Sequence, residues 1–225
     1  MKWIYLAAGV ILFIKVLIFP STAGASPAEL AVAETIVETV VQESGVPNAV
    51  SGILFRNRLY DTIFEVVVFT IAIMGARFLL ADEQPSVTVY QFADQPSIVL
   101  ARLGATIAAL VCVELAIRGH LSPGGGFAAG VAGGTAIGLV AITSPAEWME
   151  GVYHRWRAAT WEKVSVLIFI AISLLSLLGI ALPARELGTL ISGGWIPLLN
   201  ILVALKVALG SWAAILIFIR YRGLL

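Results

Sequence analysis

Long apolar stretches separated by shorter polar segments make up most of this 225-residue chain. A bilayer core about 30 Å thick is crossed by roughly 20 mostly apolar residues in an α-helix. The pattern therefore predicts an all-α integral membrane bundle of about six transmembrane helices. These stretches cover residues 3–19, 62–81, 98–117, 126–142, 163–182 and 197–219.

The first stretch, residues 3–19, has two interpretations. Lys2, the apolar run and the small residues 23–25 resemble a secretory signal peptide with its cleavage site. Lys15, however, lies inside the run that would form the apolar centre of such a signal. We therefore favour a retained membrane helix that ends before Pro20.

Residues 27–45 follow a different pattern. Apolar residues recur at helical spacing, while Glu34 and Glu38 lie one turn apart on another face. Gly45 and Pro47 mark the end of the segment. This pattern predicts one amphipathic helix at the membrane surface. Its acidic face is either simply solvated or concentrates cations at an entrance.

Two polar segments separate later apolar stretches. Residues 82–97 hold three acids and two prolines, and residues 144–163 hold three tryptophans. We expect both segments to be loops. The tryptophans suit the lipid headgroup zone, where an amphipathic ring has both environments available.

Composition supports the membrane assignment. The chain is 60% hydrophobic and 12% charged, whereas soluble domains are about 45–50% apolar and about 25% charged. The formal net charge of zero does not indicate a nucleic-acid-binding face. One cysteine, Cys112, forms no disulfide within the chain, and two histidines do not make a His-rich metal site. No metal or other cofactor is predicted.

Positive charge is unevenly divided between the two sides of the predicted bundle. Cytoplasmic loops carry an excess of lysine and arginine. Both termini are therefore predicted on the cytoplasmic side of the cell membrane, in a multi-pass topology. The richer side holds Lys2, Arg155, Arg157, Lys163, Arg220 and Arg222, and the other holds Arg56, Arg58, Arg118 and Arg185.

The fourth apolar stretch carries a regular glycine pattern. Gly126, Gly130, Gly134 and Gly138 recur every four residues and so line one stripe of a helix. A stripe without side chains lets another helix backbone approach closely, as in small-xxx-small membrane packing. We favour this packing role over the alternative of a narrow wet path along the stripe.

A glycine-rich turn precedes that helix. Residues 120–127 read His-Leu-Ser-Pro-Gly-Gly-Gly-Phe, and three consecutive glycines allow backbone angles that other residues avoid. We expect a tight turn between two spans. His120 near the interface either titrates close to neutral pH or is a loop histidine that hydrogen-bonds locally, which we favour.

Charged residues within predicted spans are costly, and each is a functional candidate. They are Lys15, Glu65, Arg77, Glu114 and Lys206. Glu65 lies one turn after Asp61, so the two share a helix face. A carboxylate at the edge of a dry region binds and releases a proton, or binds a cation.

The other charges have alternatives. Lys15 and Lys206 either titrate because of burial or form ion pairs with acids on other helices. Glu114 lies four residues before Arg118, which favours a local pair. For Arg77 we favour a side chain that extends to the interface from near a helix end.

Two segments are similar to known families. The run from Gly119 to Phe127, Gly-His-Leu-Ser-Pro-Gly-Gly-Gly-Phe, resembles the signature of the MnhB/MrpB subunit of Mrp-type sodium/proton antiporters. The resemblance implies that residues 90–225 form a four-helix membrane domain of this kind.

Residues 48–65 resemble a segment at the C-terminal end of the large MrpA subunit, which also occurs as a separate small subunit in membrane-bound hydrogenases. The matching positions are Asn48, Val50, Arg58, Asp61, Thr62 and Glu65. The chain thus resembles a fusion. Residues 1–85 would supply two spans and the amphipathic helix, and the polar segment 82–97 would be the seam.

The resemblance implies an accessory, non-enzymatic subunit of a hetero-oligomeric complex that exchanges Na⁺ for H⁺, with other Mrp-type membrane subunits and the lipid bilayer as partners. We place Glu65 in the ion path, with Asp61 beside it. The further ion-path candidates are Lys15, Glu114, Lys206 and His120.

Two alternatives stay open at the level of sequence. The same module would serve in a redox-driven relative, such as a membrane-bound hydrogenase or a complex I-like enzyme. The chain would otherwise be a structural membrane scaffold whose charges form static pairs.

Overall fold

The computed structural model describes residues 10, 14, 27–85, 89, 91–183 and 185–222. Apart from residues 10 and 14, the predicted first span lies outside these residues, and so does Lys15. By its internal contacts the chain divides after Thr39 into two units, Met1–Thr39 and Val40–Leu225. In the first unit, the helix residues 31–39 are exposed.

Helices form all the regular secondary structure of the described residues, as predicted. The N-terminal ones are α2 (Pro27–Ser44), α3 (Ala49–Gly52) and the π-helical turn η1 (Ile53–Asn57). The long ones are α4 (Leu59–Leu79), α5 (Gln95–Arg118), α6 (Gly125–Ala141), α8 (Ala158–Leu177) and α9 (Ile196–Arg222), and α7 (Ala146–Arg155) is short.

Among the described residues, α4, α5, α8 and α9 are long and apolar enough to cross a membrane. The apolar helix α6 has 17 residues, so it reaches only about 25 Å at 1.5 Å per residue. It lies at the lower limit of a membrane-crossing helix. The structure thus confirms a membrane helical bundle.

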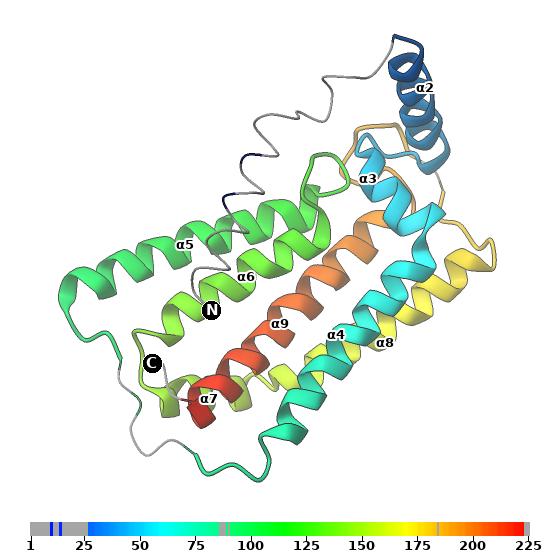
Figure 1. The fold of residues 1–225 in the computed structure, drawn as a ribbon. Helices are drawn as coiled ribbons and strands as arrows, with labels where there is room; N and C mark the ends of the chain where they lie inside the picture. Colours follow the sequence, from blue (N-terminus) through cyan, green and yellow to red (C-terminus); the bar gives the residue numbers. More distant parts are fainter. Residues whose placement is uncertain are drawn as a thin grey trace. The chain divides into compact units, whose positions relative to one another are not determined.

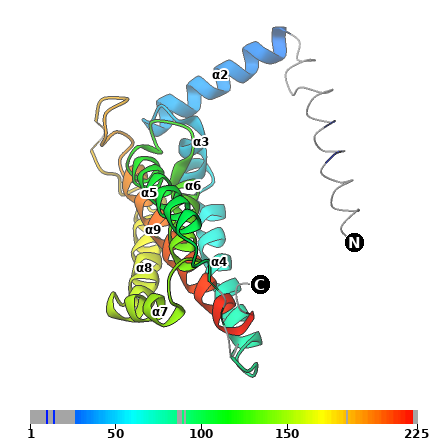
Figure 2. The ribbon, with the colours of Figure 1, turned by 90° about the vertical axis from the view of Figure 1, so that its left-hand side faces the viewer.

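In the second unit, α9 is the central helix. Along Figure 1 the order is α5, α6, α9 and then α4 with α8, and Figure 2 shows α4 and α8 on opposite sides of α9. The largest apolar cluster forms where these helices meet, around Leu59, Val66, Phe169, Leu199 and Val203. One end of the bundle, called here the α3 end, holds α3 and the α5–α6 turn; the other, the α7 end, holds α7 and the last turns of α4 and α9 (Figure 1).

The predicted loop over residues 144–163 is wrong in part. It contains α7, and α8 already begins at Ala158 rather than at Lys163. Glu162 is charged, so the segment before Lys163 was interpreted as too polar to belong to a membrane helix. In the structure the Glu162 side chain is buried inside the bundle. The helix also ends earlier than predicted, at Leu177, because Gly179 turns the chain with φ +80°.

Side-chain hydrogen bonds fix the entry into α4. Asn48 caps α3, since its side chain accepts from the backbone N–H of Val50. The Thr62 hydroxyl donates to the Leu54 carbonyl at 2.7 Å, inside η1. These bonds satisfy backbone groups that a helix end would otherwise leave unpaired.

Candidate functional site

A buried ion pair lies inside the bundle. The Lys206 side chain of α9 is 0% exposed, and its Nζ lies 2.9 Å from Oε1 of Glu162 in α8, which is 7% exposed. A buried charge persists only when it is paired and hydrogen-bonded. Of the two alternatives left open for Lys206, the structure shows the ion pair with an acid on another helix.

Helix α4 closes this site from a third direction. The Lys206 Nζ lies 4.4 Å from the ring centroid of Phe69, within the range of a cation–π interaction. Phe69 follows Glu65 by one helical turn on α4. The ammonium thus contacts residues of α4 and α8 while it projects from α9.

Glu65 has a different environment. Its side chain is exposed on α4, next to the exposed apolar residues Phe64 and Val68. Asp61 forms an ion pair with Arg58. Within the described part of the chain, Glu65 has no ion pair, with Lys206 or with any other cation. Its side chain is therefore exposed and without an ionic partner among the described residues.

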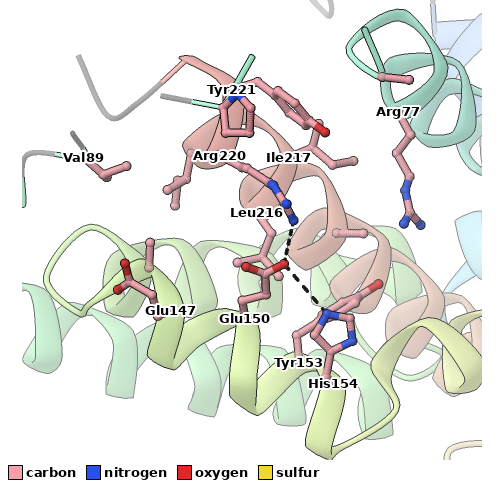
Figure 3. Close-up of a pocket in the computed structure, with 15 residues that line it drawn as sticks. Arg77, Val89, Glu147, Glu150, Tyr153, His154, Leu216, Ile217, Arg220 and Tyr221 are labelled. Carbon is pink, nitrogen blue, oxygen red and sulfur yellow. Dashed lines mark hydrogen bonds and ion pairs between the residues drawn. The ribbon is translucent and has the colours of Figure 1, made fainter. Parts of the chain in front are cut away.

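The remaining predicted charges are held locally. Glu114 Oε1 lies 3.2 Å from Arg118 Nη1, as the spacing predicted. Arg77 lies in the last turn of α4 and lines a pocket at the α7 end (Figure 3). Among the described charged candidates, Lys206 is thus the one that is fully buried.

His120 differs from both predictions made for it. Its side chain is 0% exposed, and neither ring nitrogen has a hydrogen-bond partner. Burial lowers the pKa of His120, and the backbone of Thr189 and Leu190 raises it by less. The imidazole is therefore neutral near pH 7 and does not titrate there.

Two asparagines hold the turn that carries His120. The Asn48 amide donates to the Gly119 carbonyl at 2.7 Å and to the Ser122 carbonyl at 2.8 Å. The Asn200 amide donates to the Leu115 carbonyl at 3.0 Å and to that of Ala116 at 2.7 Å, at the end of α5. Sequence reasoning missed Asn200, because a single asparagine in an apolar run gives no sign of its partner.

The glycine stripe packs α6 against α9. A Cβ at Gly126 would lie 2.4 Å from the Asn200 carbonyl oxygen, and one at Gly130 would lie 2.4 Å from Cβ of Val207. Gly134 faces Ser211 in the same way at 2.6 Å, and Gly138 reaches Ile215 at 3.4 Å. The partner helix of the predicted packing therefore belongs to this chain.

The described residues hold no group of three or more His, Cys, Asp or Glu side chains that could bind a metal ion. The chemistry they offer is that of isolated acids, a lysine and buried polar side chains. Glu162 was missed because it lies in a segment predicted as a loop. The only sequence signal for Glu162 was its position one residue before Lys163, which was predicted to start a membrane span.

These features define a multi-pass membrane protein with a charge pair between its helices. A protein-family model described as a domain related to the MnhB subunit of Na⁺/H⁺ antiporter matches residues 96–213. The chain belongs to this MnhB-related family. A search of curated proteins gives no significant match.

Two solved structures are similar to the chain. One is a chain of the membrane-bound sulfane sulfur reductase, an archaeal respiratory membrane complex, with 25% identity and a TM-score of 0.64 over 98% of this chain and 99% of that chain. The other is a chain of the Mrp complex from Dietzia sp. DQ12-45-1b, with a TM-score of 0.58 over 95% of this chain and 25% of that chain. The second is 18% identical and bears on the fold alone.

Proposed function

We propose that this chain is an accessory membrane subunit of a multi-subunit Mrp-type antiporter that exchanges sodium for protons. The observation that carries the proposal is the family match over residues 96–213, which includes the Glu162–Lys206 pair. Its partners are other Mrp-type membrane subunits in the cell membrane, with both termini on the cytoplasmic side. Residues 1–85 correspond to the end of an MrpA-like subunit, and residues 90–225 to MrpB.

The outward position of Glu65 supports a hetero-oligomeric complex. A carboxylate among exposed apolar side chains at the level of the membrane is costly against lipid. A companion subunit or a hydrated passage would give it a partner. In this proposal Glu65 and Asp61 pass ions at the boundary between subunits, and the Lys206–Glu162 pair carries charge inside the chain.

A specific observation favours a second function, that of a membrane subunit in a redox-driven complex. The sulfane sulfur reductase chain matches from end to end, with 99% of its length covered. Mild extraction and mass spectrometry of the intact complex separate the two functions. Antiporter-type subunits alone would support the first, whereas co-purified iron–sulfur subunits would replace it with the second.

Replacing Glu65 tests the ion path directly. We expect Glu65→Gln to lower sodium-dependent proton exchange in vesicles about tenfold or more, because the amide neither carries a charge nor transfers a proton. The complex should assemble at its normal level, since Glu65 has no ion pair within the described chain.

Glu43→Gln is the matched control, since Glu43 is exposed in α2, outside the membrane-crossing helices. It should leave exchange unchanged. Normal exchange by Glu65→Gln at a normal level of complex would remove Glu65 from the path.

A further inference from the structure

A pocket opens at the α7 end of the bundle. Its volume is about 470 Å³, and α7 forms one wall while the last turns of α4 and α9 form the others (Figure 3). Arg77, Tyr153 and Arg220 bring polar groups into it, and Ala213 and Ile217 form apolar wall. The space is large enough to hold several water molecules.

The same helix faces lead from this pocket to the buried ion pair. On α9, Lys206, Gly210, Ala213 and Ile217 follow one another at spacings of three or four residues, so they share a face. Lys206 and Ala213 are two turns apart, or about 10 Å along the axis. The ion pair therefore lies only a short distance beyond the inner wall of the pocket.

Helix α4 follows this line closely. A Cβ at Gly210 would lie 2.6 Å from Phe69, 2.8 Å from Ile73 and 3.3 Å from Nζ of Lys206. Phe69 and Ile73 are followed one turn later by Arg77, which lines the pocket. Gly210 thus lets apolar side chains of α4 pack closely on α9 between the pocket and the ion pair.

Tyr153 lies in the wall of the pocket and packs in one apolar cluster with Ile73 and Ala213. It lines the pocket but is only 8% exposed, and its ring packs edge to face on Trp212 at 5.2 Å. Burial raises the pKa of Tyr153, the Glu162 carboxylate raises it further, and the Arg77 guanidinium lowers it. Tyr153 also shares a buried cluster with Ala158, which precedes Glu162 by one turn of α8.

We propose that this pocket is the aqueous entrance through which protons reach the Glu162–Lys206 pair, with the Tyr153 hydroxyl as the last proton-transferring group. This inference rests on the proposed function and assigns the proton, rather than sodium, to the α7 end of the chain. The hydroxyl passes its proton toward Glu162 as it receives one from water in the pocket, so the tyrosine stays neutral. Sodium is excluded beyond the pocket, because it cannot shed its hydration shell against Phe69 and Ile73.

Tyr153→Phe tests the transfer step in the intact complex reconstituted in vesicles. The ring and its packing on Trp212 are kept, while the hydroxyl is lost. We expect proton exchange to fall about tenfold or more, with the amount and thermal stability of the complex unchanged. Tyr60→Phe, at the exposed start of α4, is the matched control and should keep full exchange.

Access to the route is tested separately in a Cys112→Ala background, which removes the native thiol. A membrane-impermeant cationic thiol reagent should inhibit exchange by Ala213→Cys when added from the α7 side, and not from the opposite side. Full exchange by Tyr153→Phe, or no inhibition of Ala213→Cys from either side, would overturn the proposal that this pocket is the proton entrance.

Glu162→Gln separates this inference from the proposed function. If Glu162→Gln abolishes exchange at a normal level of complex while Tyr153→Phe is fully active, the pair stays in the ion path and the entrance lies elsewhere. Full exchange by Glu162→Gln at a normal level of complex would overturn both.

Discussion

Replacing Lys206 with methionine is expected to destabilise the bundle by about 3–5 kcal/mol, because it leaves the Glu162 carboxylate buried without its partner. Methionine keeps most of the apolar length of lysine, so lost packing contributes little. The measurement is the fraction of complex that stays folded on heating in a mild detergent.

A double variant and a matched control help to interpret that result. Lys206→Met combined with Glu162→Met should recover most of the stability, since an apolar pair of similar volume needs no compensating charge. It should nevertheless fail to exchange protons. Recovery of both stability and exchange would make the pair a static element of structure, as in the scaffold alternative.

The exposed pair of Arg220 and Glu150 is a matched control. It has the same length, 2.9 Å, but its side chains are 53% and 44% exposed. Exposed pairs contribute little because water and ions screen them. Glu150→Gln should therefore change the thermal midpoint by only a small fraction of the change caused by Lys206→Met. Equal changes would show that burial is not the source of the effect.

Replacing Gly130 with alanine is expected to destabilise the α6–α9 contact by about 1–3 kcal/mol. The added Cβ would lie 2.4 Å from Cβ of Val207 and 2.9 Å from the Ala204 carbonyl oxygen. The second contact is with backbone, so relief requires the two helices to move apart. The loss would be partly offset by the better helix propensity of alanine.

Gly75→Ala provides the opposite case. A Cβ at Gly75 in α4 meets nothing within 4 Å, so only the propensity gain of up to about 1 kcal/mol remains. We expect the thermal midpoint to fall for Gly130→Ala and to hold or rise for Gly75→Ala. A fall of equal size in both variants would contradict the close-packing role of the stripe.

The membrane bundle could be predicted because apolar length alone decides which segments lipid accepts. The glycine stripe could also be predicted, because residues spaced by four lie on one face of a helix whichever helix packs against it. Which helix packs against it could not be predicted. Gly130 meets Val207, which lies 77 positions further along the chain, and nothing local to either residue specifies the other.

The ion-path candidates were predicted unevenly for a physical reason. Lys206 was chosen as a candidate because a charge within an apolar run is costly in a membrane. Its partner Glu162 was not chosen, because it lies in a segment whose polarity predicted a loop. His120 was placed near the interface by its glycine-rich surroundings. Its complete burial depends on the contacts of the 186–194 segment and of Asn48, which only the fold brings together.

The shortness of α6 has an electrical consequence. This helix of 17 residues lies between α5 and α9, which have 24 and 27 residues. Its first turn lies level with the end of α5 and the start of α9, because Gly126 packs on Asn200, whereas its last residue, Ala141, packs with Ile219 before α9 ends. We expect water to reach toward that C-terminal end of α6, so the membrane voltage falls over a shorter distance there and the electric field beside α9 is steeper than in the surrounding bilayer.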